Sequence, residues 1–160
     1  MSYFIRIFCQ SSDSVSRRDI QEFIVGGLHF DHSPVFIPAF LDPDSMLPDW
    51  QSLIIIYEPD TPTVNLMRHV DDSVFDAERD ALIALINDIV PAELQPDLRE
   101  TINACNQVIV IEIDREYLSE DAWSMLDALE SYLAGNLIGL VYAPDDGFYG
   151  SGLQLLHKIG

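Results

Sequence analysis

Basic residues are scarce in this chain of 160 residues. Eight lysines and arginines stand against 27 aspartates and glutamates, which gives a formal net charge of −19. Nucleic acids and anionic membrane surfaces bind proteins mainly through lysine and arginine, so we expect neither as a partner. A surface of this sign instead attracts basic proteins and cations, and it keeps the chain soluble.

Cysteines and long apolar runs are also few. The two cysteines, Cys9 and Cys105, form no CxxC pair, which is typical of a protein in a reducing compartment. Apolar runs such as LIII and VIVIEI are far too short to span a bilayer, and MSYFIRIFCQ lacks the pattern of a signal peptide. We therefore expect a cytoplasmic protein without a membrane segment.

Motifs of covalent and nucleotide chemistry are missing as well. The sequence contains neither a GxSxG nucleophile elbow nor a GxxxxGK[ST] phosphate loop. Asp42 and Asp44 begin a segment that resembles a calcium loop, but Leu47 replaces the required glycine and Leu53 replaces the bidentate glutamate. Among 27 acids, carboxylate pairs of the glycosidase kind arise by chance. We expect a protein that is not an enzyme and carries no cofactor.

The apolar residues, 48% of the chain, are sufficient for a single domain over residues 1–160. Alternating apolar, β-branched and aromatic residues predict strands, and apolar residues at helical spacing after a serine predict capped helices. Strands are expected at residues 3–9, 34–40, 52–58, 64–70, 107–113, 137–143 and 153–159. Helices are expected after Ser16, Ser73 and Ser119, the last ending at Gly135 and Asn136, with a short helix from Gln95.

This order of elements predicts an α+β domain. We expect two layers, a mostly antiparallel or mixed sheet with helices on one face, organised as a ferredoxin-like core with extra strands. Residues 3–57 and 107–159 share a plan of strand, serine-capped helix and strand pair, which suggests a βαββ duplication. If the first strands of these two stretches are parallel neighbours, Cys9 and Cys105 lie at opposite edges of the sheet, too far apart for a disulfide.

The segment PDDGFYGSG, residues 144–152, combines two carboxylates, two aromatic rings and three glycines. Pro144 at the second turn position, with Gly147 at its end, is typical of a type I turn closed by a left-handed glycine, so we expect a terminal hairpin. An irregularity at GSG lengthens this hairpin. Phe148 and Tyr149 either fold onto the sheet or form an exposed anchor for a partner.

The leading hypothesis is a non-catalytic acidic binding protein that engages a basic protein partner. Bacterial immunity proteins and DNA-mimic inhibitors use acidic surfaces in this way, an analogy of charge and size alone. Such a surface would steer a basic partner by long-range attraction. The candidate binding residues are the acids of the helix after Ser119 and the tip of the last hairpin: Glu120, Asp121, Asp127, Glu130, Asp145, Asp146, Phe148 and Tyr149.

Two alternatives stay open. In the first, the chain is a small enzyme or ligand-binding protein with a divalent metal near His29, Asp31 and His32, although no further His or Cys stands at metal spacing. In the second, it is an oligomerisation module that pairs through a sheet edge. Pro38 marks residues 34–40 as an edge strand, because proline cannot donate to a strand ladder.

Overall fold

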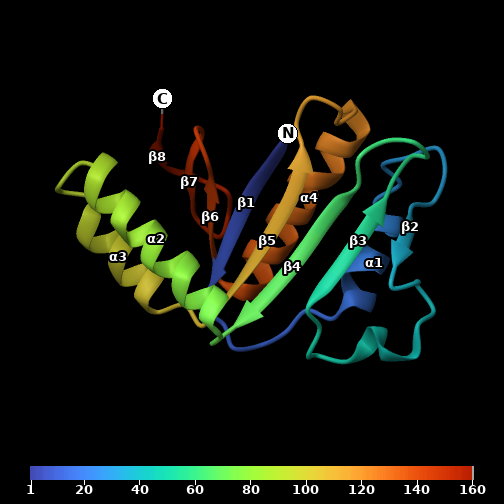
Figure 1. Cartoon of the computed structure of the whole chain (residues 1–160), viewed down its shortest axis with the longest axis horizontal. Coiled ribbons are helices and arrows are strands. Elements are labelled where there is room, and N and C mark those ends of the chain that lie inside the picture. Colours follow the sequence, from blue (N-terminus) through green and yellow to red (C-terminus); the bar gives the residue numbers. More distant parts are fainter. Residues whose placement is uncertain (160) are drawn as a thin grey trace.

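The computed structural model describes residues 1–159, which form an eight-stranded sheet (Figure 1). The strands are β1 (Ser2–Cys9), β2 (Val35–Ile37), β3 (Ser52–Ile56), β4 (Val64–Val70), β5 (Gln107–Asp114), β6 (Gly139–Ala143), β7 (Gly147–Tyr149) and β8 (Leu155–Lys158). Their spatial order is β2-β3-β4-β5-β1-β6-β7-β8, and every neighbouring pair is antiparallel. The predicted α+β class and antiparallel sheet are confirmed.

The described part of the chain also forms four α-helices and one 3₁₀ helix. These are α1 (Arg17–Gly26), η1 (Pro43–Met46), α2 (Ser73–Ile89), α3 (Gln95–Asn103) and α4 (Glu120–Leu137). Ser16 and Ser119 cap α1 and α4 as predicted, each accepting a hydrogen bond from a backbone amide of the first turn. The predicted end of α4 is two residues early, because Ile138 is the residue that takes the left-handed conformation. Within residues 1–159, none of the helices has the length and apolar character needed to cross a bilayer.

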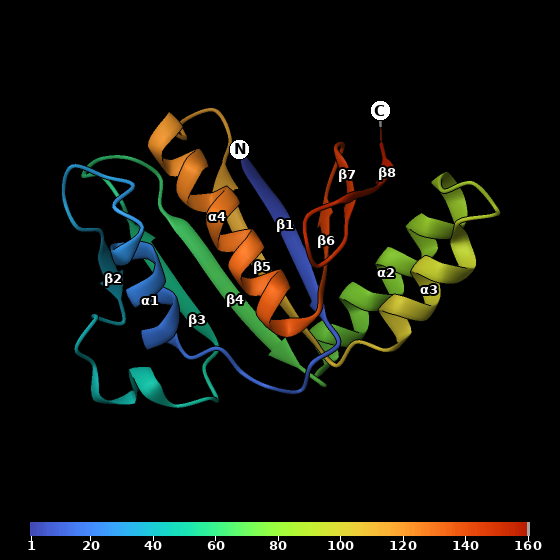
Figure 2. The same ribbon diagram turned by 180° about the vertical axis from the view of Figure 1, so that it is seen from behind.

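The helices cover both faces of the sheet. With the sheet, α1 and α4 form the predicted two-layer arrangement (Figure 2). The expectation that all helices share one face is wrong, since α2 and α3 pack on the opposite face. The strand β5 gives the reason: Ile109 and Ile111 belong to the core under α1 and α4, whereas Val108 and Val110 belong to the core under α2 and α3. A strand that is apolar on both faces needs cover on each.

The four central strands lie in the order β4-β5-β1-β6. The helix α4 connects β5 to β6, which flank β1, and α1 leads from β1 through β2 and β3 to β4. This arrangement is compatible with a ferredoxin-like core, which stays a prediction, as does the duplication of a βαββ unit.

The pairing of β1 with β5 also corrects the expectation for the cysteines. The two strands are antiparallel, with Cys9 opposite Gln107, so Cys9 and Cys105 lie at the same end of the sheet and not at opposite edges. Both thiols are nevertheless free and buried, Cys9 in the core under α1 and α4 and Cys105 in the core under α2 and α3. Burial raises the pKa of both thiols, that of Cys105 to about 12, so neither is a thiolate nucleophile at neutral pH.

The last three strands form a meander in place of the simple hairpin that was expected. A three-residue turn joins β6 to β7, and β8 then pairs with β7 across a register shift. Asp145, with φ at 63°, takes the left-handed position predicted for Gly147. Gly147 is required for a different reason, because a Cβ atom there would lie 2.5 Å from the carbonyl oxygen of His157 in β8.

The packing of α2 against the sheet can be tested at Phe75. Its side chain is 1% exposed and meets Phe8 of β1 edge to face, with ring centroids 6.3 Å apart. Phe75→Ala removes this ring from the core, so we expect the free energy of unfolding in urea to fall by about 3–5 kcal/mol. The neighbouring Val74 is 42% exposed, and Val74→Ala should change stability by less than about 0.5 kcal/mol. Equal effects of the two substitutions would contradict this packing.

Candidate functional site

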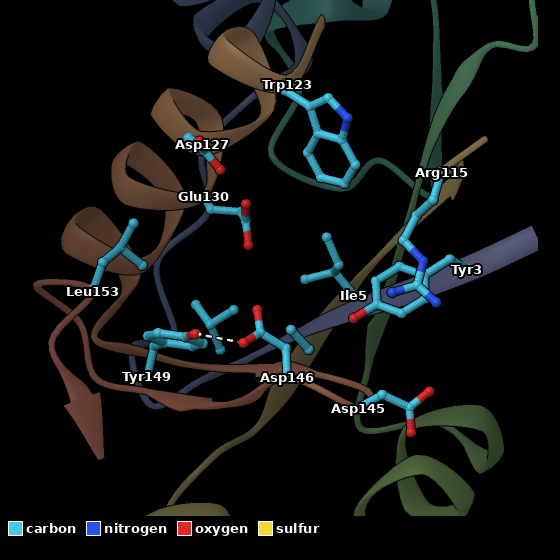
Figure 3. Close-up of a pocket in the computed structure, with 12 residues that line it drawn as sticks. Tyr3, Ile5, Arg115, Trp123, Asp127, Glu130, Asp145, Asp146, Tyr149 and Leu153 are labelled. Carbon is cyan, nitrogen blue, oxygen red and sulfur yellow. Dashed lines mark hydrogen bonds between the residues drawn. The ribbon is translucent and has the colours of Figure 1, made fainter. Parts of the chain in front are cut away.

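A cavity of about 490 Å³ lies between α4 and the sheet, at the end where β1 begins and β5 ends (Figure 3). Its base is apolar and consists of the buried side chains of Ile5 from β1 and of Val141 and Ala143 from β6. Aromatic and charged groups surround this base. They are Tyr3, Arg115, Trp123, Asp127, Glu130, Asp145, Asp146 and Tyr149, with Leu153 beside them.

One row of side chains on α4 forms a wall of the cavity. Trp123, Asp127 and Glu130 stand at positions i, i+4 and i+7, which lie on one face of a helix. Leu126 and Leu129 are fully buried against the sheet and set the rotation of the helix about its axis. This rotation directs the carboxylates of Asp127 and Glu130 toward the cavity (Figure 3).

The turn between β6 and β7 forms the opposite side and is tied to the start of β1. The Tyr3 hydroxyl donates a hydrogen bond to the carbonyl oxygen of Pro144, which holds the turn beside the cavity. The Tyr149 hydroxyl donates to the carboxylate of Asp146 at 2.9 Å. Above Tyr3, the guanidinium carbon of Arg115 lies 3.8 Å from the ring centroid, a cation–π contact.

Glu130 is the carboxyl group of the cavity with the largest shift. Burial raises its pKa, and the carboxylates of Asp127 and Asp146 raise it further, to about 8. Partial burial also raises the pKa of Asp127. Within residues 1–159, no ion pair joins these carboxylates to a basic side chain, and Arg115 lies on Tyr3 instead. The raised pKa keeps Glu130 largely protonated near neutral pH, and among the residues that the structure describes Arg115 is the one basic side chain in the lining of the cavity.

The structure brings five of the eight predicted binding residues together around this cavity. They are Asp127, Glu130, Asp145, Asp146 and Tyr149. Glu120 and Asp121 stand apart from it, exposed in the first turn of α4, and Asp121 borders a different hollow. Of the acids of α4, Asp127 and Glu130 thus line the cavity, whereas Asp121 borders the other hollow.

Phe148 does not contribute to the cavity. Its side chain is fully buried in the core under α2 and α3 and stacks on Tyr142, with ring centroids 5.0 Å apart. Successive residues of a strand point to opposite faces, so Phe148 and Tyr149 cannot form a joint exposed anchor. Phe148 therefore folds onto the sheet, and Tyr149 alone of the two lines the cavity; that Tyr149 contacts a partner stays a prediction.

Sequence patterns did not indicate Tyr3, Arg115 or Trp123. Trp123 could have been found from its spacing, because it lies on the same helical face as Asp127 and Glu130. No sequence pattern connects Tyr3 with Arg115, because they lie far apart in the chain and meet only through the antiparallel pairing of β1 and β5.

The candidate metal ligands lie elsewhere, in the loop after α1. Asp31 and His32 border a second hollow of about 590 Å³, together with Tyr57 and Asp121, whereas His29 does not line it. In the part of the chain that the structure describes, no group of three or more His, Cys, Asp or Glu side chains is arranged to hold a metal ion.

The chain matches no known protein family, no curated protein and no solved structure. Its function is therefore inferred from the chemistry of the cavity. Carboxylates accept strong hydrogen bonds from charged N–H donors, and aromatic rings attract cations over their faces. The cavity is accordingly complementary to a positively charged group.

The raised pKa of Glu130 predicts an effect of pH on stability. The unfolded chain loses the Glu130 proton near the ordinary value of 4.5, and the folded protein loses it near 8. Between these pH values the folded state retains a proton that the unfolded state has lost, so Glu130 lowers stability progressively as the pH rises. We expect Glu130→Gln to have near wild-type stability at pH 4 and to be more stable by about 2–4 kcal/mol at pH 9.

Urea unfolding at several pH values measures this difference. Asp88→Asn is the matched control, because Asp88 is exposed on α2, far from the cavity lining. Parallel stability profiles for the two variants from pH 4 to pH 9 would show that Glu130 is not buried as described.

Proposed function

We propose that this is a non-catalytic binding protein that engages a basic protein partner through α4 and the β6–β7 turn. The cavity carries this proposal. Asp127 and Glu130 from α4 line it together with Asp145 and Asp146 from the turn, and no basic side chain of residues 1–159 forms an ion pair with any of them. A basic surface would supply the missing positive charge.

The distribution of the basic residues supports the same proposal. Arg6 pairs with Glu78, Arg68 is buried and donates to Gln107, and Arg79 pairs with acids of its own helix. Three of the eight lysines and arginines are therefore engaged in contacts within the protein. The remaining field is strongly negative, which favours fast association with a basic partner and disfavours polyanions.

The composition of the cavity gives no support to cysteine or serine catalysis. Its lining contains no cysteine, histidine or serine, and both cysteines lie in the two cores with raised thiol pKa values. A cysteine or serine nucleophile with a histidine base is therefore not found in this lining among residues 1–159.

Charge neutralisation at the turn tests the proposal. A partner is captured from a lysate, identified, purified and measured against the wild type and the double variant Asp145→Asn/Asp146→Asn. Asparagine tolerates the left-handed backbone of position 145 and can still accept a hydrogen bond from Tyr149. We expect a basic partner whose association rate falls at least about fivefold in this variant and falls steeply as salt rises.

The control is Asp88→Asn/Glu93→Gln, which removes two exposed carboxylates of the α2–α3 region. Because it changes the net charge equally, it separates a local surface from the field of the whole protein. We expect less than about a twofold change in rate for this control. A purified partner that ignores both salt and the turn variant would overturn the proposal.

A second candidate function, an oligomerisation module, is favoured by β2. This strand lies at one edge of the sheet, and Val35 and Ile37 are 60% and 52% exposed. An apolar edge with unpaired backbone groups is a template for a strand of another chain. Edge pairing predicts a dimer that persists at about 1 M salt and becomes a monomer in Val35→Lys/Ile37→Lys. A wild-type monomer at high protein concentration in sedimentation would exclude this candidate.

A further inference from the structure

The cavity beside α4 combines features that select one kind of positive group. We propose that it receives the guanidinium group of an arginine side chain presented by the basic partner. This inference rests on the proposed function and adds the chemical group that is recognised. It is carried by the arrangement of the carboxylates, by the aromatic walls and by a contact that the protein already makes within the cavity.

The arrangement of the carboxylates favours an organic cation over a metal ion. The acids of α4 and Asp146 of the β6–β7 turn approach the cavity from different sides, whereas the carboxylate of Asp145 points away from Glu130 (Figure 3). No metal-holding group of three exists among residues 1–159. A guanidinium group carries five N–H donors in a flat fork. It can donate to more than one carboxylate at once without the closed shell of oxygen ligands that a metal ion requires.

The aromatic walls favour a flat cation. Trp123 stands on one side of the cavity and Tyr149 on another, and both rings are only partly buried. Tyr3 already carries the guanidinium group of Arg115 at 3.8 Å, so the cavity contains one example of the contact that we propose for its ligand. With Tyr3 covered in this way, Trp123 and Tyr149 are the rings left for an incoming guanidinium.

The base of the cavity suits the rest of an arginine side chain. Ile5, Val141 and Ala143 present apolar surface on which the methylene stem can pack while its charged end reaches the carboxylates. The volume of about 490 Å³ lies within the range of about 300–1,000 Å³ that is common for organic ligands. An ammonium group is more strongly hydrated and cannot stack, so lysine fits less well.

Glu130 couples this binding to pH. The titratable and charged groups around it are Asp127 on α4, Asp146 in the turn, Tyr149 on β7, Tyr3 on β1 and Arg115 after β5. Burial and the two carboxylates retain the Glu130 proton, whereas a bound guanidinium favours the ionised form. Binding therefore releases a proton from Glu130 to the buffer at neutral pH. Affinity should rise from pH 6 to about pH 8 and then level off, because arginine itself stays charged.

The two tryptophans make a direct test possible by NMR of their indole N–H groups. Trp123 lines the cavity, whereas Trp50 is 3% exposed and donates to the carbonyl oxygen of Val15, so it serves as an internal control. The probes are N-acetyl-arginine amide and N-acetyl-citrulline amide, which have the same shape and differ in charge. We expect the arginine probe to shift the Trp123 signal to saturation and the citrulline probe to bind at least about tenfold more weakly.

Variants assign the binding to the cavity. Glu130→Gln should weaken the arginine probe at least about fivefold at pH 8.5 and remove the rise of affinity with pH. Asp88→Asn, on the opposite face of the sheet, should leave the affinity for the arginine probe and its dependence on pH unchanged. Equal binding of the two probes, an equal shift of Trp50, or unchanged binding in Glu130→Gln would each overturn the proposal.

A further probe, N-acetyl-agmatine, carries the same single charge as the arginine probe and distinguishes a protein side chain from a free small cation. N-acetyl-agmatine binding at least about tenfold tighter than the arginine probe would assign the cavity to a small molecule and overturn our choice of occupant. Failure of the arginine pocket can also be distinguished from failure of the proposed function. A partner that depends on Asp145 and Asp146 while the arginine probe leaves Trp123 unmoved overturns only the pocket. Binding of the probe without any charge-dependent protein partner overturns only the proposed function.

Discussion

The antiparallel pairing of β1 with β5 is the contact on which the rest of this structure depends. It runs over the whole of both strands, from Ser2 opposite Asp114 to Cys9 opposite Gln107. It therefore places the first residues of β1 beside the residues that lead from β5 into α4. Tyr3 and Arg115 become neighbours in this way, and Tyr3 then fixes the turn between β6 and β7 through Pro144. The cavity is a consequence of how this central pair is aligned.

Local structure was predictable because its signals are local. Alternating apolar residues located β4 and β5, and Ser16 and Ser119 located the starts of two helices. Strand direction and the face chosen by each helix were not predictable, since both depend on partners distant in the chain. The apolar run of β5 predicted a strand, and only the packing of Val108 and Val110 against α2 and α3 explains why both of its faces are apolar.

The candidate site was half predictable for the same reason. The acids of α4 and of the turn stood out by composition, and their convergence required the chain to fold β6 and β7 beside α4. Phe148 and Tyr149 looked alike in the sequence, yet the alternation of β7 sends one into the core and the other to the cavity. Side-chain chemistry was visible in the sequence, whereas the direction of each side chain was set by the strand around it.

The carboxylates beside Glu130 oppose its ionisation, and this connects stability with selectivity. Burial beside Asp127 and Asp146 opposes ionisation of Glu130, which is the reason for its raised pKa. A ligand that brings positive charge relieves this opposition, and a neutral ligand of the same shape does not. Residues that lower stability at a site in this way are better explained by binding than by folding, because a larger apolar core would have served folding alone.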